Sequence, residues 1–222
     1  MNNTQNIKNN PKNILEVCGS KESPHGHLKL TVSSKAPVIN PEGWKDLWKL
    51  SPFSVIPEGI SVPGMNNIKS KTVENAWQFL KIWKDEEKWN KMEASEAFKS
   101  DCAIRFPRGR NPKVLGHYWQ ETEQILDYIT ARVKIYLPLY KQLLALTDRQ
   151  ILISKLKESV KNQSISIWDF DSYSYKEYGL STIYDTIFYT KLPFAHSFIL
   201  AIVVNGKELE FQDYLKNKGV DI

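Results

Sequence analysis

A carboxylic acid, an amide and an amine recur at helical spacing in the segment 71–83, which reads KTVENAWQFLKIW. At 100° per residue, Glu74, Gln78 and Lys81 share one narrow stripe, and most of the other positions are apolar. A helix that is apolar nearly all round is usually buried, and unpaired buried charge is costly. Two interpretations therefore stay open. Either the stripe faces a pocket, where an acid and an amine can do chemistry, or it is the solvated edge of a core helix.

The element that must position this stripe is a helix over about 72–84. Thr72 has the residue type of an N-cap, since its hydroxyl can accept a backbone N–H of the first turn. Asn75 stands three positions later, in place of the Glu or Gln of a complete capping box. Glu74 then lies in the first turn, where the helix dipole keeps a carboxylate ionised unless burial opposes it.

A second candidate is the basic loop 105–110, which reads RFPRGR. Arg105, Arg108 and Arg110 are separated by Pro and Gly, and guanidinium groups on such a loop can clamp a phosphate bidentately. The alternative is a basic loop that is simply solvated. Both interpretations stay open on the sequence alone.

The segment 168–171, WDFD, supplies two further carboxylates at a strand end. Asp169 and Asp171 can both line a cleft if the backbone turns there, and carboxylates suit magnesium. Capping of a turn is the commoner role for such residues, and no metal site is predicted. His196 stands among apolar neighbours, where a hydrogen-bonded core histidine is more common than a catalytic one.

Length and composition predict one substantial domain. The chain has 222 residues, 41% of them hydrophobic, which is enough to bury a real core. The Asn-rich segment 1–13 is predicted to be a flexible tail, and 14–222 a single domain. The net charge of +5 permits an anionic ligand or nucleic acid, but falls short of a protein that coats DNA.

Cysteine usage and hydropathy favour a cytoplasmic protein. Cys18 and Cys102 form no CxxC pair, which excludes a cysteine-based zinc site and makes a disulfide framework unexpected. No apolar run is long enough for a membrane span, and the first residues lack the apolar core of a signal peptide. The common P-loop, dinucleotide-binding, serine-hydrolase and zincin motifs do not occur.

Periodicity predicts an α+β fold that is mostly helical, with a few short strands. Helices are expected over 72–84, 85–98, 120–145 and 147–161, the third kinked or split at Pro138. Extended segments are expected within 14–32, at 164–169 and at 198–204, where an Asn-Gly turn follows. The stretch 33–70 is expected to be a long irregular segment, packed through its aromatic residues.

The order of these motifs resembles the NADAR superfamily, named for its link to NAD and ADP-ribose. Those proteins carry a phenylalanine–serine loop, matched here by Phe53 and Ser54. A Thr-x-Glu helix follows, with Gln four and Lys seven residues after the Glu, as in 72–81 here. A Gly-Arg element and a tryptophan come next, and Gly109-Arg110 and Trp119 are similar.

The resemblance extends over about residues 50–204. A long helix with a basic and aromatic face resembles 127–146, and a late acidic and aromatic segment resembles 168–171. The chain departs from the family pattern at Asn75, where the family usually has histidine, and it lacks the terminal Gly-rich Trp-Gly signature. These departures mark a divergent branch.

The resemblance implies a small helical α+β fold and cleavage of an N-glycosidic bond to ADP-ribose, including removal of ADP-ribose from guanine in nucleic acid. Glu74 would stabilise an oxocarbenium-like ribose or activate water. Lys81 would neutralise pyrophosphate, or trap a ring-opened ribose as a Schiff base. Gln78 would hold a ribose hydroxyl. The residues implied in substrate binding are Phe53, Ser54, Trp77, Gln78, Arg105, Arg108, Arg110, Trp119, Asp169, Asp171 and His196.

The expected function is thus that of an ADP-ribosyl N-glycosidase that needs no cofactor. Its partner would be an ADP-ribose-containing nucleotide or ADP-ribosylated nucleic acid, with no membrane involved. The alternative is a non-catalytic module that binds or sequesters a nucleotide derived from NAD. A third interpretation is an interaction protein that uses its aromatic surface.

Overall fold

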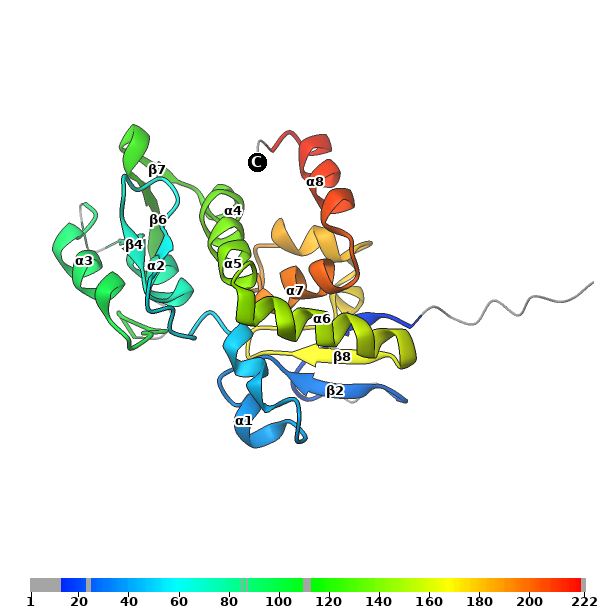
Figure 1. Cartoon of the computed structure of the whole chain (residues 1–222). Helices are drawn as coiled ribbons and strands as arrows, with labels where there is room; N and C mark the ends of the chain where they lie inside the picture. Colours follow the sequence, from blue (N-terminus) through cyan, green and yellow to red (C-terminus); the bar gives the residue numbers. More distant parts are fainter. Residues whose placement is uncertain (1–12, 23–24, 85, 87, 110–112, 221–222) are drawn as a thin grey trace, which may run out of the picture.

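The structure is a computed structural model that describes residues 13–22, 25–84, 86, 88–109 and 113–220. The predicted tail 1–13 lies outside this part of the chain, except for its last residue. The fold is a single α+β domain, as the sequence predicts, in which helices account for 45% of the residues and the strands are few and short. Two groups of elements flank a central helical rod (Figure 1).

The first group contains a three-stranded parallel sheet. Its strands are β1 (Leu15–Val17), β2 (Leu28–Thr31) and β8 (Ile165–Trp168). The order is β1-β8-β2, so β8 lies in the centre and is buried along its whole length. The extended segments predicted near 14–32 and 164–169 are therefore confirmed. Asp169 and Asp171 follow β8 directly, so they lie at the end of the sheet where its parallel strands have their C-termini.

Helices α6 (Thr147–Asn162), α7 (His196–Val204) and α8 (Glu208–Asn217) complete this group (Figure 1). The helix predicted over 147–161 is confirmed. The strand predicted at 198–204 is wrong, because this segment is α7. A continuous apolar run cannot be assigned by periodicity, and α7 is apolar all round because the core encloses it. The short 3-10 turns η4 (Tyr175–Tyr178) and η5 (Ile183–Ile187) link β8 to α7.

The second group is built around α2 (Val73–Phe79). An antiparallel sheet of β5 (Lys81–Trp83), β6 (Val114–Trp119) and β7 (Gln124–Leu126) follows it, with the turn η2 (Gln120–Thr122) inside the β6–β7 hairpin. Helix α3 (Lys91–Lys99) and the paired short strands β3 (Ile60–Ser61) and β4 (Lys69–Ser70) pack beside them.

The ends of two predicted helices differ from the expectation. The helix predicted over 72–84 ends at Phe79, and the chain then enters β5, so Lys81 begins a strand. The helix predicted over 85–98 is α3 alone, since it begins at Lys91 after an Asn90 N-cap. Residues 85 and 87 lie outside the described chain. The Thr72 cap is confirmed, because its side chain accepts the backbone N–H of Asn75 at 3.0 Å.

The central rod consists of α4 (Tyr128–Ala131), one π-helical turn (Arg132–Tyr136) and α5 (Leu137–Leu144). The helix predicted over 120–145 therefore begins later, after Asp127 caps it by accepting the N–H groups of Ile129 and Thr130. Proline has no N–H for the preceding turn, and the wider π turn stands directly before Pro138. The predicted irregularity at Pro138 is thus a π turn.

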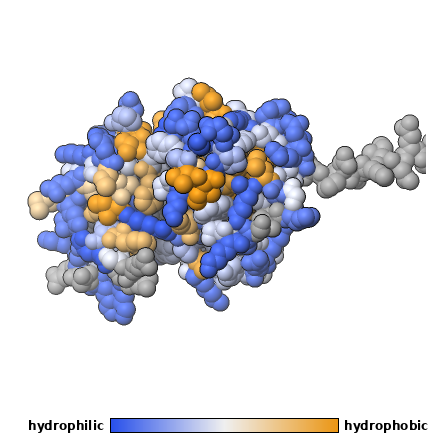
Figure 2. Space-filling model, turned by 90° about the horizontal axis from the view of Figure 1, so that it is seen from below, coloured by the Kyte–Doolittle hydropathy of each residue, from blue (hydrophilic) through white to orange (hydrophobic). Residues whose placement is uncertain are grey.

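The segment 33–70 is largely irregular, as predicted, with helix α1 (Ala36–Ile39) and the 3-10 turn η1 (Lys45–Leu50) inside it. It packs onto the core through buried residues such as Leu47 and Leu50. The view from below shows a mainly polar surface interrupted by apolar patches (Figure 2). Among the described residues, no helix combines the length and apolarity that a bilayer crossing requires.

Candidate functional site

Two adjoining cavities of about 220 Å³ each lie where α2, the central rod and the start of α7 meet the chain after β8. Ser33, Ser51, Phe53, Asp169 and His196 line the first cavity. Trp77, Gln78, Lys81, Tyr128 and Arg132 line the second cavity. Their shared wall consists of Glu74, Arg105, Tyr136, Asp171 and Phe194. The two groups of elements in Figure 1 thus both contribute to one composite site.

The predicted polar stripe of α2 faces these cavities. Glu74 is only 7% exposed, and its Oε1 accepts a hydrogen bond from Gln78 Nε2 at 2.8 Å. Gln78 Oε1 in turn accepts from Lys81 Nζ at 2.7 Å. The amide therefore links the acid to the amine, although Lys81 stands on β5 rather than on the helix. Of the two open interpretations of the stripe, the structure favours the pocket.

Burial shifts the acid and the amine toward each other in pKa. Desolvation raises the pKa of Glu74 to about 7, against the opposing effects of the Gln78 hydrogen bond and the Lys81 charge. Desolvation lowers the pKa of Lys81 to about 8, against the opposing charges of Glu74 and Asp171. A carboxyl group that titrates near neutral pH can both accept and donate a proton, which is the property of a general acid or base.

Asn75 fixes the loop that carries Arg105. Its side-chain amide donates to the carbonyl oxygens of Ala97 and Cys102, both at 2.9 Å. Its Oδ1 accepts the backbone N–H of Ile104, also at 2.9 Å. Three hydrogen bonds from one buried residue of α2 thus hold the segment just before Arg105 against the helix that carries Glu74.

Arg105 and Asp171 form an ion pair in the shared wall, with 2.6 Å between Nη2 and Oδ1. Burial raises the pKa of Asp171, and the Arg105 charge opposes that shift. The guanidinium carbon also lies 5.1 Å and 5.4 Å from the ring centres of Phe106 and Phe170. These two rings are 49% and 46% exposed, so a cation stands between two aromatic side chains that reach solvent.

Asp169 holds the backbone of two segments of the first cavity wall through its carboxylate oxygens. Its Oδ1 accepts the backbone N–H of Asp171 at 2.7 Å, and its Oδ2 accepts the N–H of Ser197 at 3.2 Å. The turn-capping role is therefore present. His196 Nδ1 lies 3.2 Å from Asp169 Oδ2, and its Nε2 lies 3.2 Å from the carbonyl oxygen of Val32. Both ring nitrogens thus face oxygen atoms of the protein, which fixes the orientation of the ring.

Trp77 forms one side of the second cavity and stacks on His117, with 4.1 Å between ring centres. His117 is 1% exposed, and neither ring nitrogen has a hydrogen-bond partner among the described residues. Burial lowers its pKa well below the usual value, and the Lys81 charge adds to this. His117 therefore stays neutral beside Trp77, which keeps a second positive charge away from Lys81.

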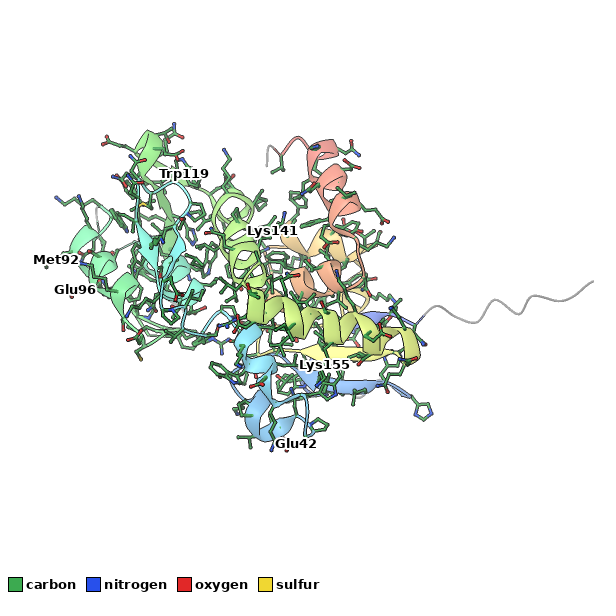
Figure 3. All side chains as sticks on the ribbon, in the orientation of Figure 1. Glu42, Met92, Glu96, Trp119, Lys141 and Lys155 are labelled. Carbon is green, nitrogen blue, oxygen red and sulfur yellow. The ribbon has the colours of Figure 1, made fainter. Side chains whose placement is uncertain are left out.

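Some of the predicted site residues lie elsewhere. Ser54 donates to the carbonyl oxygen of Lys49 at 2.9 Å and lies outside both cavity walls. Arg108 binds Glu86 and Glu93, which satisfies its charge away from the cavities. Trp119 packs against Gly64 at the outer end of the β6–β7 hairpin (Figure 3). Arg110 falls outside the described residues.

The sequence interpretation missed the contribution of the rod. Tyr128, Arg132 and Tyr136 all line the second cavity, and their spacing of four places them on one helical face. That spacing is visible in the sequence, but the apolar residues between 126 and 144 keep a stronger pattern of their own, which is typical of a core helix. Phe106, Phe170 and Phe194 were also missed, because a single aromatic residue in a loop carries no positional signal.

A magnesium site at the aspartates has no further support. Within the described ranges, no cluster of three or more His, Cys, Asp or Glu residues could hold a metal ion. Asp169 uses both carboxyl oxygens in contacts with the protein, and Asp171 is paired with Arg105. The chemistry of the site is therefore derived from its carboxyl, amine and guanidinium groups.

Comparison with known proteins gives one match. A model described as a family of unknown function, DUF6939, matches residues 24–178. Neither a curated protein nor a solved structure matches the chain. The matched segment contains α2, the rod and both aspartates after β8, whereas α7 and its His196 lie beyond it. Because the match covers well over half of the sequence, the chain belongs to DUF6939, a family of unknown function.

Proposed function

We propose that the protein is an N-glycosidase of NADAR type that removes ADP-ribose from a modified base, in a nucleotide or in nucleic acid. The observation that carries the proposal is the position of Glu74. Its carboxyl group lines both cavities, is buried, and has a pKa that burial raises to about 7. A carboxyl group with these properties suits cleavage of a glycosidic bond near neutral pH.

The reaction would break the bond between the ribose C1″ and the base nitrogen. A water molecule adds at C1″ as that bond breaks, and the base leaves with a proton on its nitrogen. Positive charge develops at the ribose in the transition state, and a carboxylate beside it is stabilising. Glu74 would take the proton from the water when ionised, or supply one to the leaving base when protonated.

Two neighbours of Glu74 support a role in glycosidic cleavage, one by orienting its carboxyl group and one by adding a second carboxyl group to the cavity wall. The Gln78 amide orients the carboxyl group through the 2.8 Å hydrogen bond and also holds Lys81. Asp171 supplies a second carboxyl group in the shared wall; burial raises its pKa, and its ion pair with Arg105 opposes that shift. Two carboxyl groups with different environments are typical of glycosidases, one to transfer protons and one to stabilise charge.

The mouth of the site favours a nucleic-acid substrate. Phe170 belongs to the wall of the first cavity and Phe106 to that of the second, and both rings are about half exposed. Arg105 lies between them. Exposed aromatic rings beside a cation stack on unpaired bases in proteins that bind single strands, with about 1–3 kcal/mol per base.

Replacing Glu74 tests the proposal. We expect Glu74→Gln to retain the fold, because Gln keeps the size and one hydrogen-bonding oxygen, and to lose about 100-fold or more in release of ADP-ribose from ADP-ribosylated guanosine or oligonucleotide. Product release is measured by chromatography. The matched control is Glu58→Gln, at an exposed carboxylate outside both cavity walls, and it should retain full activity.

Unchanged turnover by a folded Glu74→Gln variant would remove Glu74 from catalysis and end the proposal. The alternative is a module that binds ADP-ribose without cleaving it. Calorimetry with ADP-ribose separates the two functions, since tight binding without turnover of any ADP-ribosylated substrate fits only the binding module.

A further inference from the structure

Arg132 in the π turn of the rod is a buried cation without an acidic partner. Its side chain is 0% exposed, and no Asp or Glu of the described residues lies within salt-bridge distance. Its two terminal nitrogens donate to backbone carbonyl oxygens of the segment 186–192, at 2.7–3.3 Å. Its Nε has no partner among the described atoms. Carbonyl dipoles solvate the guanidinium, but they carry no net negative charge.

Arg149 shows how this chain treats a comparable buried arginine. It is 8% exposed, and its guanidinium binds the Asp148 carboxylate as well as the carbonyl oxygen of Lys49. A buried charge that lacks a counter-charge is costly, whereas a paired one is tolerated. Arg132 therefore differs from Arg149 in having no acid beside it among the described residues. A negative charge from a ligand would stabilise its buried guanidinium.

The second cavity is the place where that charge can enter. Arg132, Lys81 and Arg105 all line it, whereas its acids are only Glu74 and Asp171. Asp171 is already paired with Arg105. Among the described residues, Lys81 Nζ is engaged by the neutral Gln78 amide and by the faces of Trp77 and Trp83, at 5.5 Å and 5.6 Å from the ring centres, and by no carboxylate within salt-bridge distance. Positive charge thus exceeds negative charge at this wall.

The segment that Arg132 binds also shapes the cavity. Its Nη2 donates to the carbonyl oxygen of Leu192 at 2.7 Å, and Pro193 and Phe194 directly after it form part of the cavity wall. The ring of Tyr128 lies over the guanidinium, 4.2 Å from its carbon atom. Arg132 is therefore held in one geometry before any ligand arrives, and an anion would find the cation preorganised.

We propose that the second cavity binds an anionic group of the phosphate or pyrophosphate class, with Arg132 as its buried counter-charge and Lys81 as its direct contact. Only the identity of the larger molecule that carries the anionic group rests on the proposed function. Binding of the anion itself follows from the charges of the cavity. With three cationic groups against two acids, this site discriminates an anion from a neutral ligand of the same size.

The test uses the full chain and inorganic pyrophosphate, titrated by calorimetry at constant ionic strength. We expect saturable binding to the wild type and a loss of about tenfold or more in affinity for Arg132→Met. Arg149→Met is the matched control and should bind pyrophosphate like the wild type. Absence of binding to the wild type, or equal binding by a folded Arg132→Met variant, would overturn the proposal.

A second pair of variants leaves the carbonyl contacts of Arg132 in place. The Phe194 ring centre lies 5.8 Å from the guanidinium carbon, so Phe194→Glu supplies the missing acid from the protein itself. We expect Phe194→Glu to bind pyrophosphate at least tenfold more weakly than Phe194→Gln, which is of the same shape but neutral, so that any effect of losing the ring is common to both. Equal affinities of these two variants would contradict a role for Arg132 as the counter-charge.

The outcome is separable from that of the proposed function. Glu74→Gln removes negative charge from the second cavity, so it should bind pyrophosphate at least as tightly as the wild type. If this variant keeps its turnover and pyrophosphate still binds, the glycosidase fails and the anion site stands. If turnover depends on Glu74 but the wild type binds no pyrophosphate, the anion site alone fails.

Discussion

Glu74 and Lys81 change charge within a narrow interval of pH. Burial raises the pKa of the carboxyl group to about 7 and lowers that of the amine to about 8, so both side chains are closer to neutrality than in water. Gln78 connects them through two hydrogen bonds. A small change in the local field, such as a bound anion, is therefore enough to move a proton on or off this pair.

The same shifts predict a minimum in stability near neutral pH. The raised pKa of Glu74 means that the folded chain holds more protons than the unfolded chain between about pH 4.5 and 7, so its contribution falls as pH rises there. The lowered pKa of Lys81 means the opposite between about pH 8 and 10.5, where its contribution rises with pH. We expect the free energy of unfolding to change by about 1–3 kcal/mol over each of these two pH intervals.

Urea unfolding at a series of pH values measures this effect. The double variant Glu74→Gln, Lys81→Met lacks both titrating groups, so the difference between wild type and variant should be most unfavourable to the wild type at pH 7–8. The exposed pair Lys161→Met, Glu158→Gln on α6 serves as control. Parallel profiles for the wild type and the first variant would show that neither pKa is shifted by folding.

At the scale of elements, Asn75 links α2 to the chain before Arg105. We expect Asn75→Ala to lower the free energy of unfolding by about 2–4 kcal/mol, because three buried hydrogen bonds are lost and their backbone partners stay buried. Asn162→Ala is the control, since Asn162 is exposed at the end of α6 and makes a single bond of 3.3 Å. Denaturant unfolding of both variants checks the prediction, and equal stabilities would contradict it.

The elements that the sequence predicts correctly are those with strong local signals. Helix α6 combines length with an amphipathic pattern, and Thr72 has the residue type of an N-cap. The end of α2 was misplaced because Lys81 lies beside Gln78 whether the chain continues as a helix or turns into β5. Segment 198–204 was misassigned because burial on every side erases periodicity.

The sequence indicates part of the candidate site through the spacing of one helix, and through residue type it also indicates Phe53, Arg105, Asp169, Asp171 and His196, which line the cavities as well. Glu74, Trp77 and Gln78 share α2, so their spacing reveals a common face. Arg132 and Tyr136 come from a rod whose place beside α2 depends on packing between distant segments. The other three phenylalanines of the cavity walls lie in loops without periodicity. Ser54, Arg108 and Trp119 match motifs in type, but local hydrogen bonds, ion pairs or packing fix them elsewhere.

At the scale of the whole molecule, the core continues beyond the segment that the family model matches. That segment ends at residue 178, yet α7 is almost wholly buried and contacts the central sheet. Each buried side chain of α7 contributes about 1.5–3 kcal/mol, and several together exceed the whole stability of a typical domain, about 5–15 kcal/mol. We therefore expect a chain that ends at 178 to remain unfolded.

Circular dichroism and proton NMR of the truncated chain check this expectation. The matched comparison is a chain that ends at residue 207, which lacks α8 and so loses the buried core residues Phe211 and Leu215 together with the partly buried Tyr214 and Val220. This longer chain should fold with lower stability than the full chain. A cooperative thermal transition for the chain that ends at 178 would show that the matched segment folds alone.

The order β1-β8-β2 also has a consequence for biosynthesis. Leu15 and Leu28 both pair with Ile165, which lies 150 and 137 residues later in the chain, respectively. While the ribosome is still making the middle of the protein, the edges of β1 and β2 that will flank β8 have no partner. Pairings between such distant residues form slowly, and unpaired strand edges promote aggregation. The parallel sheet therefore cannot form until the chain through residue 168 has emerged from the ribosome.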